Sequence, residues 1–211
     1  MAIKERKEKQ KGYLKQRILE VAKDLFLKNG YDATSIRKIA EQIGYSPTTI
    51  YLYYKEKSDI IYALHQEGFK ILGSQFRVLQ LVSNPFERLK AMGKVYMKFA
   101  LENPDFYELM FILAEPISFV NKHCNVEWEE GKAAFSALLD TVSECKQMGY
   151  FKDVDLHSIT LVIWSTMHGL CSLNLRGHLD HVANVHLAVP EDSAVLDKAF
   201  NCLVVVLDSM K

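Results

Sequence analysis

The sequence contains few cysteines, and none of the four lies close to another. Cys124, Cys145, Cys171 and Cys202 are scattered through the second half, a pattern typical of free thiols in a reducing cytoplasm and not of a disulfide framework. The charged N-terminus is not followed by an apolar stretch, which argues against a secretory signal. Neither a glycine-rich phosphate loop nor a nucleophile elbow occurs. These absences predict a cytoplasmic protein that is not an enzyme and binds no cofactor.

The sequence also lacks the alternation of apolar and polar residues that marks strands, and it has no internal repeat. Its 211 residues suffice for a small module and one helical domain of ordinary size. Proline, glycine and asparagine interrupt a series of apolar runs with helical spacing. We therefore predict an all-α fold with helices over 12–28, 35–43, 47–53, 58–81, 86–101, 105–113, 120–148, 154–176 and 192–210. Residues 177–190 are expected to form a long irregular connection.

One stretch, residues 156–175, has no formal charge, and its length alone would allow a membrane span. Nine of its twenty residues are Ser, Thr, His, Asn or Gly, which are poor groups to expose to lipid. A helix without charge on any side is more simply explained by burial in protein on several sides. We therefore expect no membrane contact.

Residues 34–57 predict two short helices joined by a tight turn. Apolar residues from Ile36 to Ile43 lie on one helical face, and Gly44 suits the left-handed conformation that ends a helix. Ser46-Pro47 then provides an N-cap and a first-turn proline for the next helix. Thr34 is expected to cap the first helix. This pattern is that of a helix-turn-helix.

The second of these helices carries hydroxyl and phenol groups that its own core does not need. Such groups can reach phosphates, base edges and thymine methyls in a major groove, whereas the alternative is a helical hairpin whose hydroxyls are merely solvated. We expect Arg37, Thr48 and Thr49 near base edges and the tyrosines and lysines mainly on phosphates. The complete predicted DNA-binding set is Ser35, Arg37, Ser46, Pro47, Thr48, Thr49, Tyr51, Tyr53, Lys55 and Lys57.

The total charge of the chain is zero, but the charge is unevenly distributed. Up to Lys57 there are 13 basic and 7 acidic residues, and the remainder has 13 and 19, so the two parts carry +6 and −6. A basic N-terminal module on an acidic body is expected when one end meets phosphate. The first residues are the most basic and are either an arm that contacts DNA or a solubilising tail.

The segment from Tyr13 to Ile60 resembles the DNA-binding domain of the tetracycline-repressor family. Residues that match the family pattern are Gly30, Tyr31, Thr34, Ser35, Ile39, Ala40, Gly44, Ser46, Thr49, Tyr51 and Lys57. Tyr54 stands where phenylalanine is usual. Further on, Trp164, His168 and Gly169 resemble a short pattern of one C-terminal subgroup. The resemblance implies a DNA-binding helix-turn-helix domain at 1–57 and a helical ligand-binding and dimerisation domain at 58–211.

The resemblance implies a homodimeric transcriptional repressor that a small molecule releases from a palindromic operator. Two apolar C-terminal helices would leave a large apolar surface on a monomer, which pairing with a second copy would cover. The predicted interface residues are Leu196, Phe200, Leu203 and Leu207. Two alternatives are open: a constitutive DNA-binding factor of this fold without an inducer, and a helical enzyme that uses the motif for assembly.

Large aromatic and sulfur-containing side chains predict a mostly apolar ligand pocket, although each of them singly is also a normal core residue. No group of Arg or Lys accompanies them, so a neutral or cationic hydrophobic compound is expected over a phosphorylated one. The predicted ligand-binding residues are Phe99, Tyr107, Met110, Phe111, Trp128, Phe135, Trp164, Met167 and His168. His178, His181 and His186 lack the spacing of a metal site and are interpreted as surface histidines, so no metal is expected.

Overall fold

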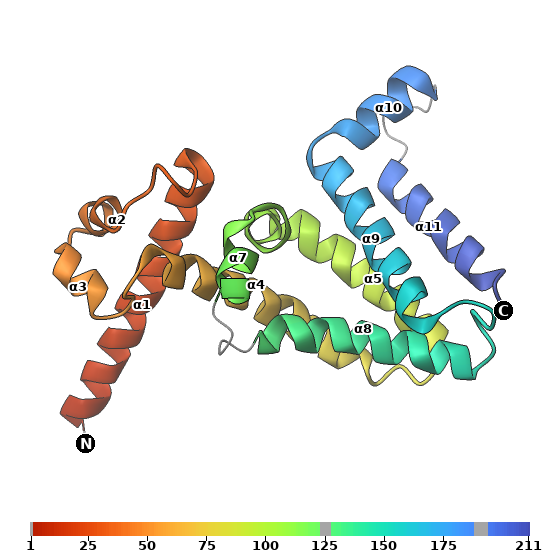
Figure 1. Ribbon diagram of the computed structural model, residues 1–211, viewed down its shortest axis with the longest axis horizontal. Coiled ribbons are helices and arrows are strands. Elements are labelled where there is room, and N and C mark those ends of the chain that lie inside the picture. The colour runs from red at the N-terminus through yellow and green to blue at the C-terminus, as the bar shows by residue number, and fades with distance from the viewer. Residues whose placement is uncertain (1, 123–127, 188–193) are drawn as a thin grey trace. The chain divides into compact units, whose positions relative to one another are not determined.

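A computed structural model of the protein describes residues 2–122, 128–187 and 194–211, with no strand among them (Figure 1). The all-α prediction is confirmed. Contacts divide the chain into two compact units. Unit 1 comprises Met1–Gly68 and Asp105–Trp128, and unit 2 comprises Phe69–Pro104 and Glu129–Lys211. The functional division at residue 57 stays a prediction, and Cys124 lies outside the described residues.

Unit 1 begins with helices α1 (Ala2–Asn29), α2 (Ile36–Ile43), α3 (Pro47–Tyr51) and the first part of α4 (Lys57–Leu79). The N-cap of α2 is Ser35, whose side chain accepts a hydrogen bond from the Lys38 amide. Thr34 was expected in this role, but its buried hydroxyl donates to carbonyl groups of Leu25 and Gly30 near the end of α1. Thr34 therefore holds the α1–α2 loop closed.

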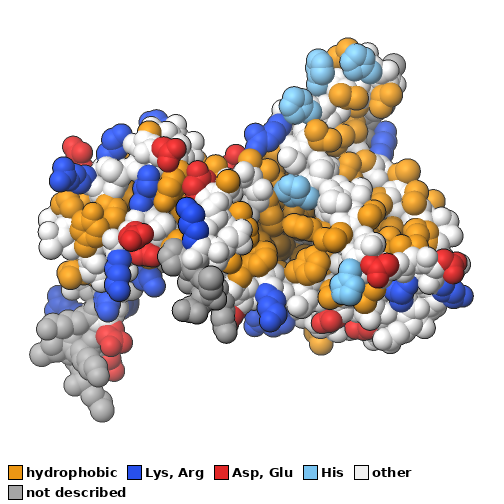
Figure 2. Space-filling model, in the orientation of Figure 1, with side chains coloured by type: hydrophobic (Ala, Val, Ile, Leu, Met, Phe, Trp, Pro, Cys, Tyr) orange, Lys and Arg blue, Asp and Glu red, His pale blue; other side chains and the backbone are white. Residues whose placement is uncertain are grey.

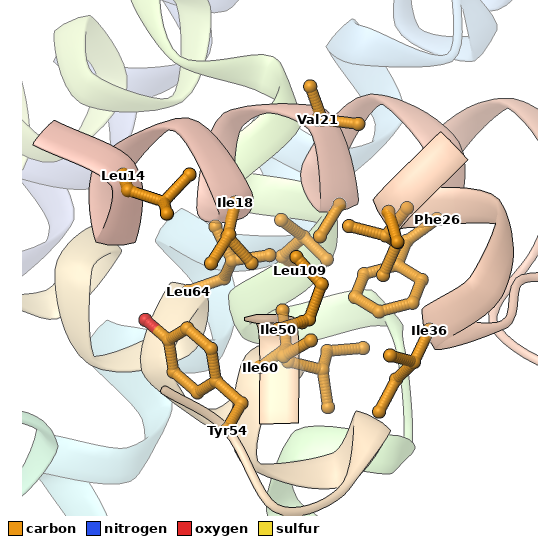
Figure 3. Close-up of a cluster of buried hydrophobic side chains, with 14 residues drawn as sticks. Leu14, Ile18, Val21, Phe26, Ile36, Ile50, Tyr54, Ile60, Leu64 and Leu109 are labelled. Atoms are coloured by element: carbon orange, nitrogen blue, oxygen red, sulfur yellow. The ribbon is translucent and has the colours of Figure 1, made fainter. Parts of the chain in front are cut away.

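The core of unit 1 joins residues that are far apart in sequence (Figure 3). Ile18 of α1, Ile50 of α3 and Leu64 of α4 pack with Leu109, and all four are at most 1% exposed. Leu109 belongs to a π-helix, η1 (Glu108–Ile112), which follows α6 (Pro104–Tyr107) and precedes α7 (Glu115–Lys122). The helix-turn-helix is therefore stabilised by a segment from the middle of the chain.

Unit 2 is built from the end of α4, α5 (Pro85–Glu102), α8 (Glu129–Gln147), α9 (Leu156–Leu175), α10 (His178–His186) and α11 (Val195–Asp208). Helix α5 packs on α8 and α9, and α11 lies beside α9 (Figure 1). In the core of unit 2, the rings of Phe86 and Tyr150 stack with their centroids 4.4 Å apart. Buried Arg88 donates to Glu144 at 2.9 Å and to the Val82 carbonyl at 3.0 Å, so it ties the start of α5 to α8.

Two of the predicted elements are wrong. The single helix predicted over 120–148 is divided into α7, which ends at Lys122, and α8, which begins at Glu129; residues 123–127 lie outside the described residues. The irregular connection predicted over 177–190 contains α10. Gly177, at φ 71°, ends one helix and starts the next, which is possible because glycine adopts this conformation without a side-chain clash.

No helix in the described parts of the chain combines the length and apolarity that crossing a membrane requires. This includes α9, the uncharged segment. Burial raises the pKa of the Cys145 thiol to about 11 and that of the Cys171 thiol to about 12, so both are unreactive at neutral pH. Cys202 of α11 is exposed.

Candidate nucleic-acid interface and effector residues

The turn between α2 and α3 is held by local hydrogen bonds. Gly44 adopts φ 75°, and its amide and that of Tyr45 bond to carbonyl groups of the last turn of α2. Ser46 accepts a hydrogen bond from the Thr49 amide at 3.2 Å, and the two hydroxyls lie 2.9 Å apart. These caps fix the direction of α3 within unit 1, which a reading helix requires.

The outward face of α3 is uncovered by the rest of its unit. Thr48 is exposed, Tyr51 is 52% exposed and Leu52, just past the helix, is 77% exposed. Tyr45 in the turn is 47% exposed. Leu52 and Tyr45 were missing from the predicted site residues, although their positions at the ends of α3 would have indicated them. An exposed leucine beside hydroxyls suits contact with thymine methyls.

Other predicted DNA-binding residues serve the module itself. Ser35 and Ser46 are helix caps, and Tyr53 is half-buried and packs on the core of unit 1. The Lys57 ammonium donates to the Tyr31 carbonyl at 2.7 Å and lies 3.9 Å from the centre of the Tyr31 ring. These contacts hold Lys57 against Tyr31 in the free protein. Arg37 and Lys55 are exposed.

The predicted effector residues fall into two groups, one in each unit. In unit 2, the Tyr96 hydroxyl lies 3.2 Å from Nδ1 of His168, and the Trp164 ring centre lies 6.4 Å from that of His168 and 6.0 Å from that of Phe135. Burial lowers the pKa of His168 and keeps the imidazole neutral at pH 7. Tyr96 was not predicted because a single tyrosine in an apolar run carries no signal of its partner.

The remaining predicted effector residues are less suited to a guest. Phe99 and Met167 are buried in unit 2, and Tyr107 and Met110 are buried in unit 1. Two predicted residues of unit 1, Phe111 and Trp128, are half-buried. The ring centres of Phe111 and Tyr107 are 5.2 Å apart, and those of Trp128 and His65 are 6.0 Å apart. Neither unit therefore brings together the whole predicted set.

His65, on the part of α4 in unit 1, is 1% exposed, and burial lowers its pKa from 6.5 to about 4, partly offset by a hydrogen bond with the Met110 backbone. Between pH 4 and 6.5 the unfolded chain therefore binds more protons than the folded chain. The free energy of unfolding should fall as the pH drops from 6.5 to 4, by about 3 kcal/mol at most. Urea unfolding across this range measures the slope. His65→Gln should remove most of it and His157→Gln, at an exposed site, should not; equal slopes in both variants would contradict this assignment.

The structure places most of the predicted dimer-interface residues in the interior of unit 2. Leu196, Phe200 and Leu207 are 4–7% exposed because they pack inside their own unit, and Leu203 is half-buried. A β-carbon on Gly93 of α5 would lie 2.5 Å from the Phe200 ring, which shows how closely α11 packs there. The exposed apolar residues of the C-terminal helices are others: Leu161, Val162 and Leu173 on α9, and Cys202, Val205 and Val206 on α11.

The three histidines of α10 lie exposed beside Val182, Val185 and Leu187, and Figure 2 shows them grouped on that end of unit 2. The His181 and His186 rings are 6.4 Å apart. Within the described residues, no group of three His, Cys, Asp or Glu side chains is placed to hold a metal ion.

Similar proteins match both halves of the chain. Residues 18–64 match the family of bacterial regulatory proteins of the tetR type, and residues 89–196 match the tetracyclin repressor-like C-terminal domain. The chain is 41% identical over 59 residues to the fatty acid metabolism regulator protein of Bacillus subtilis, covering 28% of this chain and 30% of that one. It is 28% identical over 90 residues to an HTH-type transcriptional regulator of Staphylococcus aureus, covering 42% and 49%. The chain thus spans less than half the length of these relatives.

A solved structure supports the same fold over nearly the whole chain. The fatty acid degradation regulator FadR of Bacillus halodurans superimposes with a TM-score of 0.67 at 20% identity, covering 90% of this chain and 94% of that one. At this identity the likeness concerns the fold alone. The C-terminal family match by itself extends over more than half of the 211 residues. The chain therefore belongs to the tetracycline-repressor family of bacterial DNA-binding transcriptional regulators.

Proposed function

We propose that this protein is a homodimeric repressor that binds a palindromic operator through α3 and leaves it when a small hydrophobic molecule binds to unit 2. The observation that carries the proposal is the uncovered face of α3, where exposed Thr48, Tyr51 and Leu52 follow a hydrogen-bonded turn. Regulators of this family act on operators as dimers and respond to small ligands, which supports the same conclusion.

The dimer is proposed to form through the exposed apolar face of α9 and α11. Leu161 and Val162 of α9 are 49% and 53% exposed, and Val205 and Val206 of α11 are 68% and 52% exposed. A β-carbon on Gly169 of α9 would meet nothing within 4 Å, so this position leaves room for another helix. A two-fold axis between such faces makes the same contact twice and presents two copies of α3, which favours a palindromic site.

The test of DNA reading begins with a duplex selected from a random-sequence library by the wild-type protein. Arg37→Ala and Thr48→Ala should each weaken binding by about 1–3 kcal/mol and relax the preference at particular base pairs, because these side chains are proposed to contact base edges. Binding titrations against single-base variants of the duplex measure both effects. Lys28→Ala, an exposed change at the far end of α1, is the control. An equal loss of affinity for all duplex sequences would contradict the proposal that Arg37 and Thr48 contact base edges.

The effector is proposed to bind around Trp164 and His168. This group combines half-buried rings with a polar pair, the Tyr96 hydroxyl and the neutral His168 imidazole, which can orient a guest. A ligand can change operator affinity only by its different affinities for the DNA-binding and released states, typically about 1–3 kcal/mol. Two similar proteins are named for fatty acid metabolism or degradation. Fatty acids are therefore tested as probe ligands in addition to lipophilic cations.

The two tryptophans, Trp128 and Trp164, allow the effector site to be tested directly. We expect tetraphenylphosphonium or palmitate to raise the melting temperature, weaken operator binding and change the fluorescence of Trp128→Phe, which retains Trp164. The fluorescence of Trp164→Phe should not respond, and Trp164→Ala should lose the ligand response while its ligand-free DNA binding is kept. A probe panel that changes neither melting nor operator binding would favour a constitutive DNA-binding factor instead.

A further inference from the structure

The N-terminal part of α1 is a helix that its own unit does not cover. Leu14, which is 8% exposed, is the first residue of α1 in the core of unit 1. All described side chains before it are exposed, including Tyr13 at 70%. Figure 1 shows this part of α1 extending beyond α2 and α3. At 1.5 Å per residue, the uncovered helix is about 18 Å long.

Helix continuity has a physical explanation here. The sequence before Leu14 is rich in Lys, Glu, Gln and Arg, which favour helices, and the packed part of α1 already provides the nucleus that an isolated helix would have to form. The N-terminus is therefore a basic helix, and not the extended arm that a minor groove would accept.

Lysines recur along this helix every three or four residues, at positions 4, 7, 11 and 15. This spacing assigns the four positions to one helical face, which we call the lysine stripe. The Lys15 ammonium lies 5.9 Å from the centre of the Tyr54 ring, just past α3, so the described end of the stripe is on the side of the helix-turn-helix that leads from α3 into α4.

The described lysines of the stripe are not neutralised by ion pairs within the folded chain. Among the described side chains, Arg17 pairs with Glu20, whereas no ion pair is formed by Lys11 or Lys15. A polyanion beside the stripe would offset the repulsion between the lysine charges.

We propose that the lysine stripe binds the DNA phosphates that flank each operator half-site, so that α1 extends the footprint beyond the bases contacted by α3. This rests on the proposed function, because α3 must first dock on DNA. Phosphate charges occur about every 1.7 Å along the duplex axis, so a stripe about 16 Å long can meet several of them. Such contacts add affinity and salt dependence without sequence preference.

The test compares the selected duplex in two lengths, one ending at the half-sites and one extended on both sides by a helical turn. For Lys11→Gln/Lys15→Gln, we expect the slope of log affinity against log salt to be shallower by about 0.9 for each of the four lysines removed per dimer. The wild type should bind the extended duplex more tightly than the short one, and this difference should be smaller in the variant, which keeps only Lys4 and Lys7 of the stripe. Lys11→Arg/Lys15→Arg should behave as the wild type, and Lys28→Gln should change the slope at neither length.

The outcomes separate this proposal from the proposed function. If Arg37→Ala relaxes base preference while the double glutamine variant keeps the wild-type slope and flank dependence, α3 reads DNA and the stripe proposal is overturned. If no duplex can be selected, the proposed function fails first. Loss of binding to phosphatidylglycerol vesicles in the double variant, with DNA binding unchanged, would reassign the stripe to an anionic lipid surface and overturn the proposal.

Discussion

Val205→Glu should dissociate the dimer and lower operator affinity by about a hundredfold or more. Val205 is 68% exposed in the single chain and lies on the apolar face proposed to pair with a second copy. In a two-fold interface the change occurs twice, and each carboxylate would be buried without a partner. The separated protomers would then bind half-sites independently and lose the gain that comes from linking two binding events.

Sedimentation velocity at micromolar protein concentration, followed by titration of the selected duplex, measures both effects. Val78→Glu is the matched control, because Val78 of α4 is 65% exposed and lies outside the proposed face. This variant should remain dimeric with wild-type affinity. A monomeric wild type, or a Val205→Glu protein that still sediments as a dimer, would refute this interface.

Leu109→Ala should lower the free energy of unfolding by about 2–5 kcal/mol, the range for removing a fully buried leucine side chain. Leu109 is 0% exposed and packs with Ile18, Ile50 and Leu64 in unit 1. The cavity would lie under the helix-turn-helix, so protection of α1 and α2 amides from hydrogen exchange should fall with it. For the same reason, a peptide ending at Lys57 should not fold alone, since it lacks Leu64 and Leu109.

Urea unfolding and amide exchange measure this effect, with Leu101→Ala as the control. Leu101 of α5 is 47% exposed, so its truncation should change the unfolding free energy by about 0.5 kcal/mol or less. Equal destabilisation by the two substitutions would mean that Leu109 does not support the DNA-reading module.

The helix-turn-helix could be predicted because its signals are local. Gly44 ends α2 in a left-handed conformation, and Ser46-Pro47 starts α3, as the sequence indicates. A cap or a turn depends on residues within a few positions of one another, so it can be recognised from sequence. The contact of Lys57 could not be predicted in this way. Its partner Tyr31 is 26 residues away, and no local pattern indicates that the Lys57 ammonium forms a hydrogen bond with the Tyr31 carbonyl.

The sequence by itself determined the all-α class, the DNA-reading motif and the apolar character of the C-terminal helices. Only the tertiary structure decided which side of those helices is buried. Helix α11 carries apolar residues around most of its circumference, and Phe200 and Leu207 turn inward whereas Val205 and Val206 turn out. Likewise, Leu109 packs into the core of the DNA-binding module, although the sequence pattern of that module ends about fifty residues before Leu109. Periodicity reports that a face is apolar, but the neighbour that covers it comes from distant parts of the chain.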